Sequence, residues 1–239
     1  MMGAPKHQET AKLMSAPFES LAPAPAQDES CPLAVQPTRA KSAWREYAEA
    51  FGTALILALL IRSFVVQAFK IPSGSMLPTL QVGDHILVNK FIYGIRLPIA
   101  GTLLVPISTP RRGDVVVFEY PVDPSKDFIK RVVGVGGDVI QIRDKHVSVN
   151  GQTWDDPHAY FVDGEAAGHG NSPRDTYGPV TVPPGHIFVM GDNRDSSYDS
   201  RFWGFVDVNE VTGRAFLIYW SWDGDDHWVR WNRVGERIY

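Results

Sequence analysis

Beyond residue 80 the chain consists of short runs of β-branched and aromatic residues, separated by Gly, Pro and Asp. Apolar and polar side chains alternate in these runs, a period of two that is typical of β-strands. Residues 145–154 contain Asn150-Gly151, which is the strongest short-range signal for a β-hairpin. We therefore expect a mostly β, antiparallel fold. The expected strands are 85–89, 114–120, 128–135, 138–142, the hairpin 145–154, 180–190, 215–222 and 228–231.

One long apolar stretch precedes these strands. Ala50–Ile61 carries no charge, and a second apolar run follows after Arg62-Ser63. A helix from Trp44 to Gln67 would be about 36 Å long, enough to cross a hydrocarbon core of about 30 Å. Glu49 and Arg62 shorten its uncharged centre, although Arg62 can extend its charged group towards the interface. We expect a single transmembrane signal-anchor helix over residues 44–68.

Two other interpretations of this stretch remain open. The helix could be amphipathic and lie buried or on a surface. It could also be a cleaved signal peptide, because Val66-Gln67-Ala68 resembles the small-residue end of a cleavage site. About forty residues precede the apolar run, which is long for the charged region of a signal peptide. The uncleaved anchor therefore remains the expectation.

The segments on either side of the expected helix indicate how the chain is divided into parts and on which side of the membrane its N-terminus lies. Residues 1–43 are rich in Ala and Pro and poor in aromatic residues, so they are expected to form a disordered tail. We expect residues 69–239 to form one β-rich domain with a polar insertion around 141–180. The basic residues nearest to the helix give a modest positive-inside bias that favours a cytoplasmic N-terminus. They are Arg39, Lys41 and Arg45 before it, and Lys70 and Lys90 after it.

Composition excludes several classes of function. The net charge of -4, with Lys and Arg scattered, gives no electrostatic footprint for nucleic acid. Cys31 is the only cysteine, which excludes an internal disulfide and a cysteine-based zinc site. The histidines show no His-x-x-x-His or His-Glu-x-x-His spacing, so no metal site is expected. Six of the seven histidines lie beyond the expected tail, at His85, His146, His158, His169, His186 and His227.

The segment Ile71–Leu80 (IPSGSMLPTL) places a candidate serine nucleophile, Ser75, shortly after the expected anchor. A Gly-x-Ser-x-Gly elbow would need glycine at position 73, where Ser73 stands, and the chain has no Ser-x-x-Lys. By composition alone, Ser-Gly and Pro are also typical of a plain surface turn. A catalytic role for Ser75 therefore depends on a partner elsewhere in the chain.

The expected strand 128–135 offers one candidate partner. Side chains alternate across a strand, so Phe128, Lys130 and Val132 share one face. A lysine between two apolar residues on a buried face loses hydration, which lowers its pKa and makes it a possible general base. The other interpretation is an edge lysine that reaches water along its apolar stem.

A third segment, Gly191–Arg201 (GDNRDSSYDSR), combines hydroxyl, carboxylate and guanidinium groups. Its composition fits a solvated loop, but catalytic groups are also commonly held by loops on a rigid scaffold. Near the end of the chain, Trp220, Trp222, Trp228 and Trp231 lie close together. These rings either pack in the core or dock at the level of lipid headgroups.

Five motifs in a fixed order make the assignment more specific. They are IPSGSMLPTL, GDHILVNKFIYG, RRGDVVVFEYP, DFIKRVVGVGGD and GDNRDSSYDSRFWGFV. Together they resemble bacterial type I signal peptidase, the leader peptidase family of Ser/Lys endopeptidases, over about residues 60 to 220. The resemblance implies that Ser75 is the nucleophile and Lys130 the general base. It also implies an oxyanion hole formed by the Ser73 hydroxyl and the Ser75 backbone N–H.

The same resemblance implies roles for residues around this pair. Ser197 would hydrogen-bond to Lys130, and Asp199 with Arg201 would brace the loop. The family cleaves signal peptides of exported preproteins after small residues, at the outer side of the bacterial cytoplasmic membrane and without a cofactor. The positions that match its substrate pockets are Phe69, Ile71, Pro72, Met76, Leu80, Ile86, Val117, Asp127, Phe128 and Ile129.

Two other functions remain open from the sequence. A specialised protease of the same clan would mature one pilus or conjugation substrate. A membrane-anchored β-domain without catalysis would serve envelope assembly, and it predicts that Ser75 and Lys130 lie far apart. Partners expected from the resemblance are signal peptides, the lipid bilayer and the export machinery, with no nucleic acid.

Overall fold

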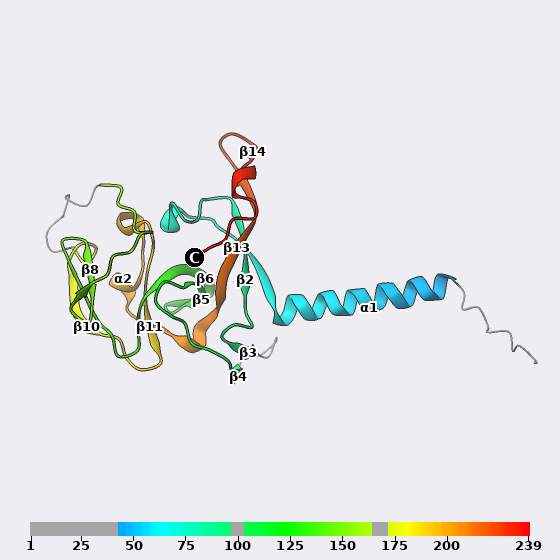
Figure 1. The fold of residues 1–239 in the computed structure, drawn as a ribbon, viewed down its shortest axis with the longest axis horizontal. Helices are drawn as coiled ribbons and strands as arrows, with labels where there is room; N and C mark the ends of the chain where they lie inside the picture. The colour runs from blue at the N-terminus through cyan, green and yellow to red at the C-terminus, as the bar shows by residue number, and fades with distance from the viewer. Residues whose placement is uncertain (1–42, 97–102, 164–171) are drawn as a thin grey trace, which may run out of the picture. The chain divides into compact units, whose positions relative to one another are not determined.

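The computed structural model describes residues 43–96, 103–163 and 172–239, so the expected tail lies almost wholly outside the described residues. The largest sheet runs in the order β1-β2-β13-β5-β6-β11-β12, with β14 paired to β13, and its pairings are antiparallel. Its strands are β1 (Val66–Lys70), β2 (Asp84–Asn89), β5 (Val115–Tyr120), β6 (Asp123–Val135), β11 (His186–Met190), β12 (Val206–Asp207), β13 (Val211–Asp223) and β14 (Trp228–Val229). The expectation of a mostly antiparallel β fold is confirmed (Figure 1).

Two smaller sheets complete the described strands. A four-stranded sheet in the order β10-β7-β8-β9 is built from β7 (Val139–Arg143), β8 (His146–Val149), β9 (Gln152–Thr153) and β10 (Tyr177–Thr181). The hairpin expected at Asn150-Gly151 is present, and both residues have positive φ, 54° and 77°, as a type I′ turn requires. Strands β3 (Gly94–Arg96) and β4 (Leu103–Pro106) form a separate pair.

The N-terminal helix is shorter than expected. Helix α1 covers Ala43–Phe64, whereas the apolar pattern predicted a helix to Gln67. The last predicted residues instead begin β1, whose five residues pair with β2, Val66 opposite Asn89 and Lys70 opposite His85. Pairing along a whole neighbouring strand outweighs the helical pattern there. Among the described residues, no helix combines the length and the apolar character needed to cross a membrane.

The expected strand 180–190 is in fact two strands in different sheets. Strand β10 ends at Thr181 and β11 begins at His186, with Pro183-Pro184 between them. Proline has no N–H to donate to a sheet, so the run is interrupted there. The short strands β3, β4 and β12 were not predicted, because two to four residues carry too little periodicity. The remaining short elements are η1 (Gly74–Met76), η2 (Arg194–Ser196), α2 (Ser200–Trp203), η3 (Val208–Glu210) and η4 (Trp231–Arg233).

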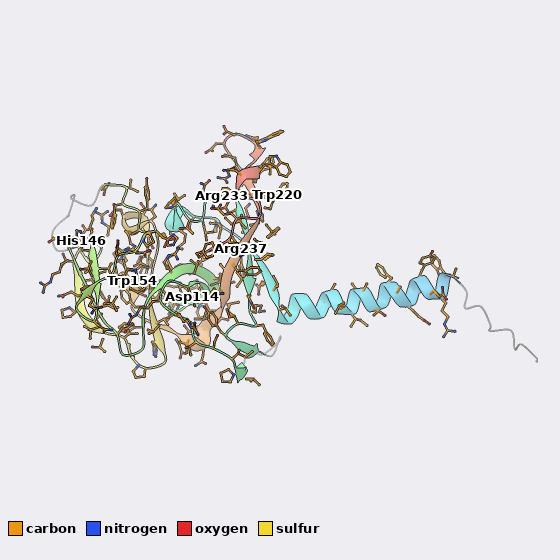
Figure 2. All side chains as sticks on the ribbon, viewed as in Figure 1. Asp114, His146, Trp154, Trp220, Arg233 and Arg237 are labelled. Atoms are coloured by element: carbon orange, nitrogen blue, oxygen red, sulfur yellow. The ribbon has the colours of Figure 1, made fainter. Side chains whose placement is uncertain are left out.

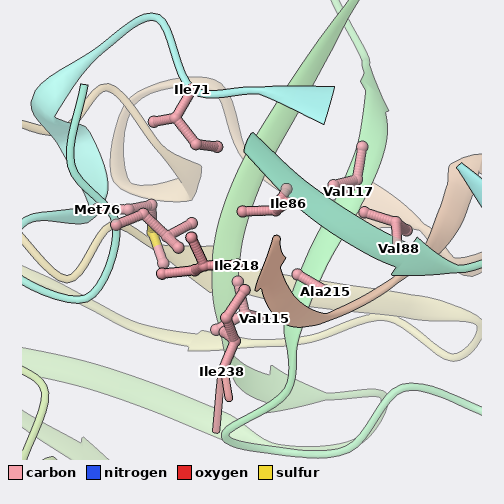
Figure 3. Packing of buried hydrophobic residues seen from close by; sticks show 10 residues of the cluster. Ile71, Met76, Ile86, Val88, Val115, Val117, Ala215, Ile218 and Ile238 are labelled. Carbon is pink, nitrogen blue, oxygen red and sulfur yellow. The ribbon is translucent and has the colours of Figure 1, made fainter. Parts of the chain in front are cut away.

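Three apolar clusters form the core, and the first of them supports the serine segment. Figure 3 shows Ile86 and Val88 of β2 packed with Val115 and Val117 of β5, and Met76 of η1 reaching the same cluster. The other two clusters lie around Phe118 and Val132, and around Ile140 and Phe188. Of the two placements left open for the C-terminal tryptophans, packing in the core is excluded, because all four are exposed, by 36% to 67%: Trp220, Trp222, Trp228 and Trp231.

A buried ion pair links the C-terminal segment to β2. Asp84 is fully buried and accepts hydrogen bonds from Arg233 Nη2 at 2.6 Å and from Ser221 Oγ at 2.6 Å. Arg233 also donates to the backbone oxygen of Thr79, at 2.9 Å. Figure 2 shows Arg233 and Trp220 close to each other at the β14 end of β13. The pair therefore fixes the end of the chain against the segment that follows Ser75.

We predict that Arg233→Met destabilises the fold by about 3–5 kcal/mol, because Asp84 is left as a buried charge without its partner. Urea unfolding measures this change. Arg214→Met is the matched control, since Arg214 is 42% exposed and pairs with Asp114 at 3.2 Å. Its cost should stay at about 1 kcal/mol or less. Equal costs in the two variants would contradict a special role for the buried pair.

Candidate active site

Ser75 lies in the short helix η1, directly after β1. The turn is held by Met76, which is fully buried in the first core cluster, and by hydrogen bonds from Leu77 N to Gly74 O and from Leu80 N to Met76 O. Asn193 adds two further bonds, from its backbone N to Ser75 O at 3.2 Å and from Nδ2 to Gly74 O at 3.1 Å. The serine is therefore positioned by the core below it and by the loop beside it.

Lys130 on β6 meets this serine. Its Nζ lies 2.9 Å from Ser75 Oγ and 2.9 Å from the backbone oxygen of Ile129. Lys130 is only 4% exposed, so the alternative of a lysine reaching water from a sheet edge is wrong. The close approach also contradicts the prediction made by a non-catalytic β-domain, that these two residues lie far apart.

Burial changes the acidity of Lys130. Loss of hydration lowers the pKa of its ammonium group to about 8, against the opposing effects of Asp199 and Asp192. The cause lies in the strand pattern: Phe128 and Val132 on the same face pack in the second core cluster. The Nζ also lies 5.3 Å from the centre of the Phe128 ring. The sequence-based prediction of an apolar setting for Lys130 is confirmed.

The next residue along β6 points the other way and binds the polar loop. Arg131 forms a bidentate ion pair with Asp192, with Nε 2.8 Å from Oδ1 and Nη2 2.7 Å from Oδ2. Both residues are almost fully buried. The Thr79 hydroxyl donates to Asp192 Oδ2 at 2.6 Å, so the loop is also bonded to the serine segment.

A second ion pair stabilises the loop itself. Arg201 Nε and Nη2 each donate to Asp199, both at 2.8 Å, and Asp199 Oδ2 accepts from Gly191 N at 3.1 Å. Arg201 Nη2 also donates to Arg194 O at 2.7 Å, which links the end of the loop to η2 within it. Asp199 and Arg201 therefore contact each other as the resemblance implied.

Ser197 differs from the expectation. It is buried beside the serine turn, but among the described residues its Oγ has no hydrogen-bond partner. The expected bond to Lys130 is not formed, because the lysine Nζ is directed to Ser75 and the Ile129 carbonyl. Gly191 explains how close the segments come: an added Cβ would lie 2.3 Å from Ser197 Oγ and 2.4 Å from Ser75 O. Only glycine fits there.

Ser73 lies two residues before Ser75 with an extended backbone, φ -135° and ψ 157°. Its side chain makes no capping hydrogen bond to η1 and is exposed. The hydroxyl is therefore accessible from solvent at the edge of the site. Its position is compatible with the expected oxyanion role, which remains a prediction.

A narrow cavity of about 40 Å³ lies beside the pair. It is lined by most of the residues expected to form the substrate pockets: Phe69, Ile71, Pro72, Ile86, Val117, Asp127, Phe128 and Ile129. Met76 and Leu80 do not line it, because both are fully buried within the first core cluster. Burial and the neighbouring Glu119 raise the pKa of the Asp127 carboxyl at this cavity.

The polar insertion contributes contacts that the sequence did not reveal. Lys145 Nζ lies 3.0 Å from Asp195, and both side chains are buried. Arg194 pairs with Asp156, and Tyr160 N donates to Asp192 O at 2.7 Å. The polar insertion expected around residues 141–180 is thus bonded to the polar loop Gly191–Arg201. Asp and Arg are frequent in both segments, which was the only indication of these contacts in the sequence. The sequence does not show which of these residues pair with one another.

Comparison with known proteins agrees with this geometry. The sequence profile of signal peptidase, peptidase S26, matches residues 44–220. Signal peptidase I of Pseudomonas aeruginosa is 41% identical over 209 residues, 74% of this chain and 72% of its own. The same enzyme of Pseudomonas fluorescens is 40% identical over 222 residues, 80% of this chain and 78% of its own.

A more distant relative is signal peptidase I of Aquifex aeolicus, 37% identical over 219 residues, 70% of this chain and 81% of its own. The family match extends over the serine turn, the strand of Lys130 and the polar loop. The chain therefore belongs to the signal peptidase family, peptidase S26, and is a serine peptidase.

Proposed function

We propose that this protein removes N-terminal signal peptides from exported preproteins after small residues, with Ser75 as nucleophile and Lys130 as general base. The observation that carries the proposal is the 2.9 Å approach of Lys130 Nζ to Ser75 Oγ at a buried lysine. A lysine with a pKa of about 8 is neutral in about one molecule in ten at pH 7, against about one in 2,500 at its reference pKa.

The reaction follows from these positions. Neutral Lys130 takes the proton of Ser75 Oγ as this oxygen attacks the scissile carbonyl carbon. The Ser75 N–H and the Ser73 hydroxyl donate to the developing oxyanion, each contributing about 3–4 kcal/mol. Lys130 then gives its proton to the leaving amine, and a water molecule hydrolyses the acyl-enzyme with Lys130 again as base. The ion pair between Asp199 and Arg201 holds the loop beside the pair.

The cavity supports the preference for small residues. It is small, about 40 Å³, and the bulky side chains of Ile71, Ile86 and Ile129 line it. Phe69 and Pro72 lie at the same cavity. The small side chain of the residue before the cleaved bond would occupy it.

We also propose that the protein works at the outer side of a bacterial cytoplasmic membrane, anchored by α1 (Ala43–Phe64) with the N-terminus in the cytoplasm. Support comes from the exposed apolar side chains of α1, among them Phe51, Ile56 and Leu59. The exposed C-terminal tryptophans would add a contact at the level of the headgroups. Substrate signal peptides would then reach Ser75 from the same bilayer.

The decisive experiment is cleavage of a model preprotein in detergent. Ser75→Ala and Lys130→Ala should each abolish cleavage while the fold is retained, because both groups act in one proton transfer. The double variant should lose no more activity than either single variant. Ser125→Ala and Lys126→Ala, at exposed positions near the start of β6, are matched controls and should stay active. Substantial turnover by Lys130→Ala would refute the assignment of the base.

The pH dependence follows from the pKa of Lys130. Only the neutral amine is a base, so kcat/KM should rise with pH until the group is deprotonated and then level off above pH 8. At pH 6 it should be about 100-fold below this plateau, given a pKa of about 8. A profile that is flat from pH 5 to pH 9 would contradict the proposal.

The pocket predicts a change in selectivity. Ile129→Ala enlarges the cavity. The kcat/KM for substrates with a residue larger than Ala before the cleaved bond should therefore rise, by about 10- to 200-fold for each methylene that the larger cavity accommodates. Sequencing of the cleavage products measures this change. Ile92→Ala, a half-buried isoleucine that packs on a different core cluster, is the control and should keep the strict preference.

The membrane contact predicts binding without the helix. A shortened chain that begins at Val65 keeps β1 and should still float with lipid vesicles. Trp228→Ala and Trp231→Ala should weaken flotation, since these rings are 67% and 62% exposed. Phe91→Ala, which removes a ring that is 45% exposed elsewhere, should not. If the shortened chain does not float at all, all contact with lipid belongs to α1.

A further inference from the structure

Strand β1 lies at the edge of the largest sheet and follows α1 directly. It pairs with β2 on one side, and among the described residues no strand pairs with its other side. Only Val65 separates β1 from α1 (Figure 1). The Val65 carbonyl accepts a hydrogen bond from Lys90 N at 3.0 Å. The end of α1 is therefore bonded to the sheet that carries the cavity.

The cavity beside Ser75 and Lys130 is lined by two strands with free edges. Phe69 of β1 lines it on one side, and Ile129 of β6 lines it on the other. At this position β6 pairs with β5 alone among the described strands, because β11 pairs with β6 only over residues 131–135. An extended peptide can lie along such edges by adding a strand.

The order of the lining residues gives the bound substrate a direction. On β1 they lead from Pro72, close to Ser75, back to Phe69, and on β6 they lead from Ile129, next to Lys130, back to Asp127. In the proposed function, the residue before the cleaved bond occupies this cavity. Residues further before the bond therefore run beside β1 towards α1, in the same chain direction as β1.

The end of α1 is close to this cavity. Phe64, the last residue of α1, is five positions before Phe69, which corresponds to at most about 17 Å of strand. About five extended substrate residues cover the same distance. A signal peptide carries an apolar region of about 7–15 residues before its cleavage site. This apolar region would therefore arrive beside α1.

The surface of α1 is suited to an apolar partner. Leu55 and Leu57 are 50% and 56% exposed, and they lie about 200° apart around the helix axis. No charged residue occurs between Ala50 and Ile61. A helix that is apolar on all sides is buried in protein or lies in a membrane. One face of α1 can thus contact lipid while another contacts a second apolar helix.

We propose that α1 binds the apolar region of the signal peptide, and that the two helices lie side by side in the bilayer with parallel chain directions. This inference rests on the proposed function and extends the substrate site from the cavity into the membrane. The two helices are held together at one end, because β1 follows α1 and the bound cleavage segment follows the apolar region. Packing between helices in lipid then adds affinity to that of the cavity.

Disulfide formation between the two helices tests this arrangement in lipid vesicles. The full-length enzyme carries Cys31→Ser, Ser75→Ala to keep the substrate intact, and one cysteine substitution on α1. A model preprotein carries a single cysteine in its apolar region, and an oxidant is added. A disulfide requires Cβ atoms within about 3.5–4.5 Å of each other, so it reports direct contact.

Opposite faces of α1 provide matched positions for the cysteine. Leu55→Cys and Leu59→Cys form one row along the helix, and Thr53→Cys and Leu57→Cys form a row on the opposite face. One row should form disulfides with the preprotein and the other should not. Val122→Cys, at a position that is 68% exposed between β5 and β6, is the control and should form none.

The parallel direction and the cavity each give a further expected result. When the preprotein cysteine is moved four residues towards its N-terminus, the strongest disulfide should also move four residues towards the N-terminus of α1. Binding at the cavity should be required. A preprotein with Trp in place of the small residue before the cleaved bond should therefore lose the disulfide.

Kinetics provide a readout that membrane anchoring alone would not change. Leu57→Ala and Leu59→Ala are matched variants, one in each row. The variant in the responding row should raise KM for the preprotein about 3- to 30-fold with kcat unchanged, as contacts between helices in lipid allow. Its KM for a short peptide without an apolar region should not change. The other variant should change neither KM.

Several results would overturn the inference. Disulfides with both rows alike would indicate random encounters in lipid, and disulfides with neither row would leave α1 in contact with lipid alone. Disulfides only between two copies of the enzyme would assign the face to a second copy. A shift in the opposite direction, or a disulfide that persists with Trp before the bond, would contradict the parallel arrangement or its link to the cavity. Failure of the proposed function looks different, because the wild type would then leave the preprotein uncleaved whatever disulfides form.

Discussion

The ion pair between Arg131 and Asp192 joins the three segments from which the site is built. Arg131 belongs to the strand of Lys130, Asp192 to the polar loop, and the Thr79 hydroxyl on the same carboxylate to the serine segment. The other contacts of the site can form only when these three segments are aligned with one another. A buried ion pair contributes little net stability once the loss of hydration is included, but loss of one partner is costly. The Arg131–Asp192 pair therefore favours one arrangement of the three segments over arrangements that separate the two charges.

Side chains that alternate across β6 place two neighbouring cationic residues, Lys130 and Arg131, in opposite electrostatic environments. Lys130 faces apolar side chains, which lower its pKa, while its neighbour Arg131 faces a carboxylate that compensates its charge. A shift in register by one residue would exchange these settings. The lysine would then be held as a cation beside Asp192 and could not act as a base. Reactivity at position 130 thus depends on the sheet register.

Local patterns explain which parts of the structure could be predicted. The β-branched runs gave the long strands, Asn150-Gly151 gave the hairpin, and the order of motifs gave the family. Strand β1 was mistaken for the end of a helix, because its pairing with β2 is a contact between segments about twenty residues apart. Polar contacts between residues far apart in the chain could not be predicted from the sequence either. The two bonds from Asn193 to the serine turn and the pair between Lys145 and Asp195 depend on folding, not on any pattern near those residues.

Asn193 has a consequence for the peptide group that carries the Ser75 N–H. The Gly74 carbonyl and the Ser75 N–H belong to one planar unit, in which a trans bond makes them point in opposite directions. The hydrogen bond from Asn193 Nδ2 to the Gly74 carbonyl, at 3.1 Å, opposes rotation of this unit. The N–H is therefore kept aimed away from Asn193 before any substrate arrives. In the proposed oxyanion hole, Asn193 would thus orient the Ser75 N–H before a substrate binds.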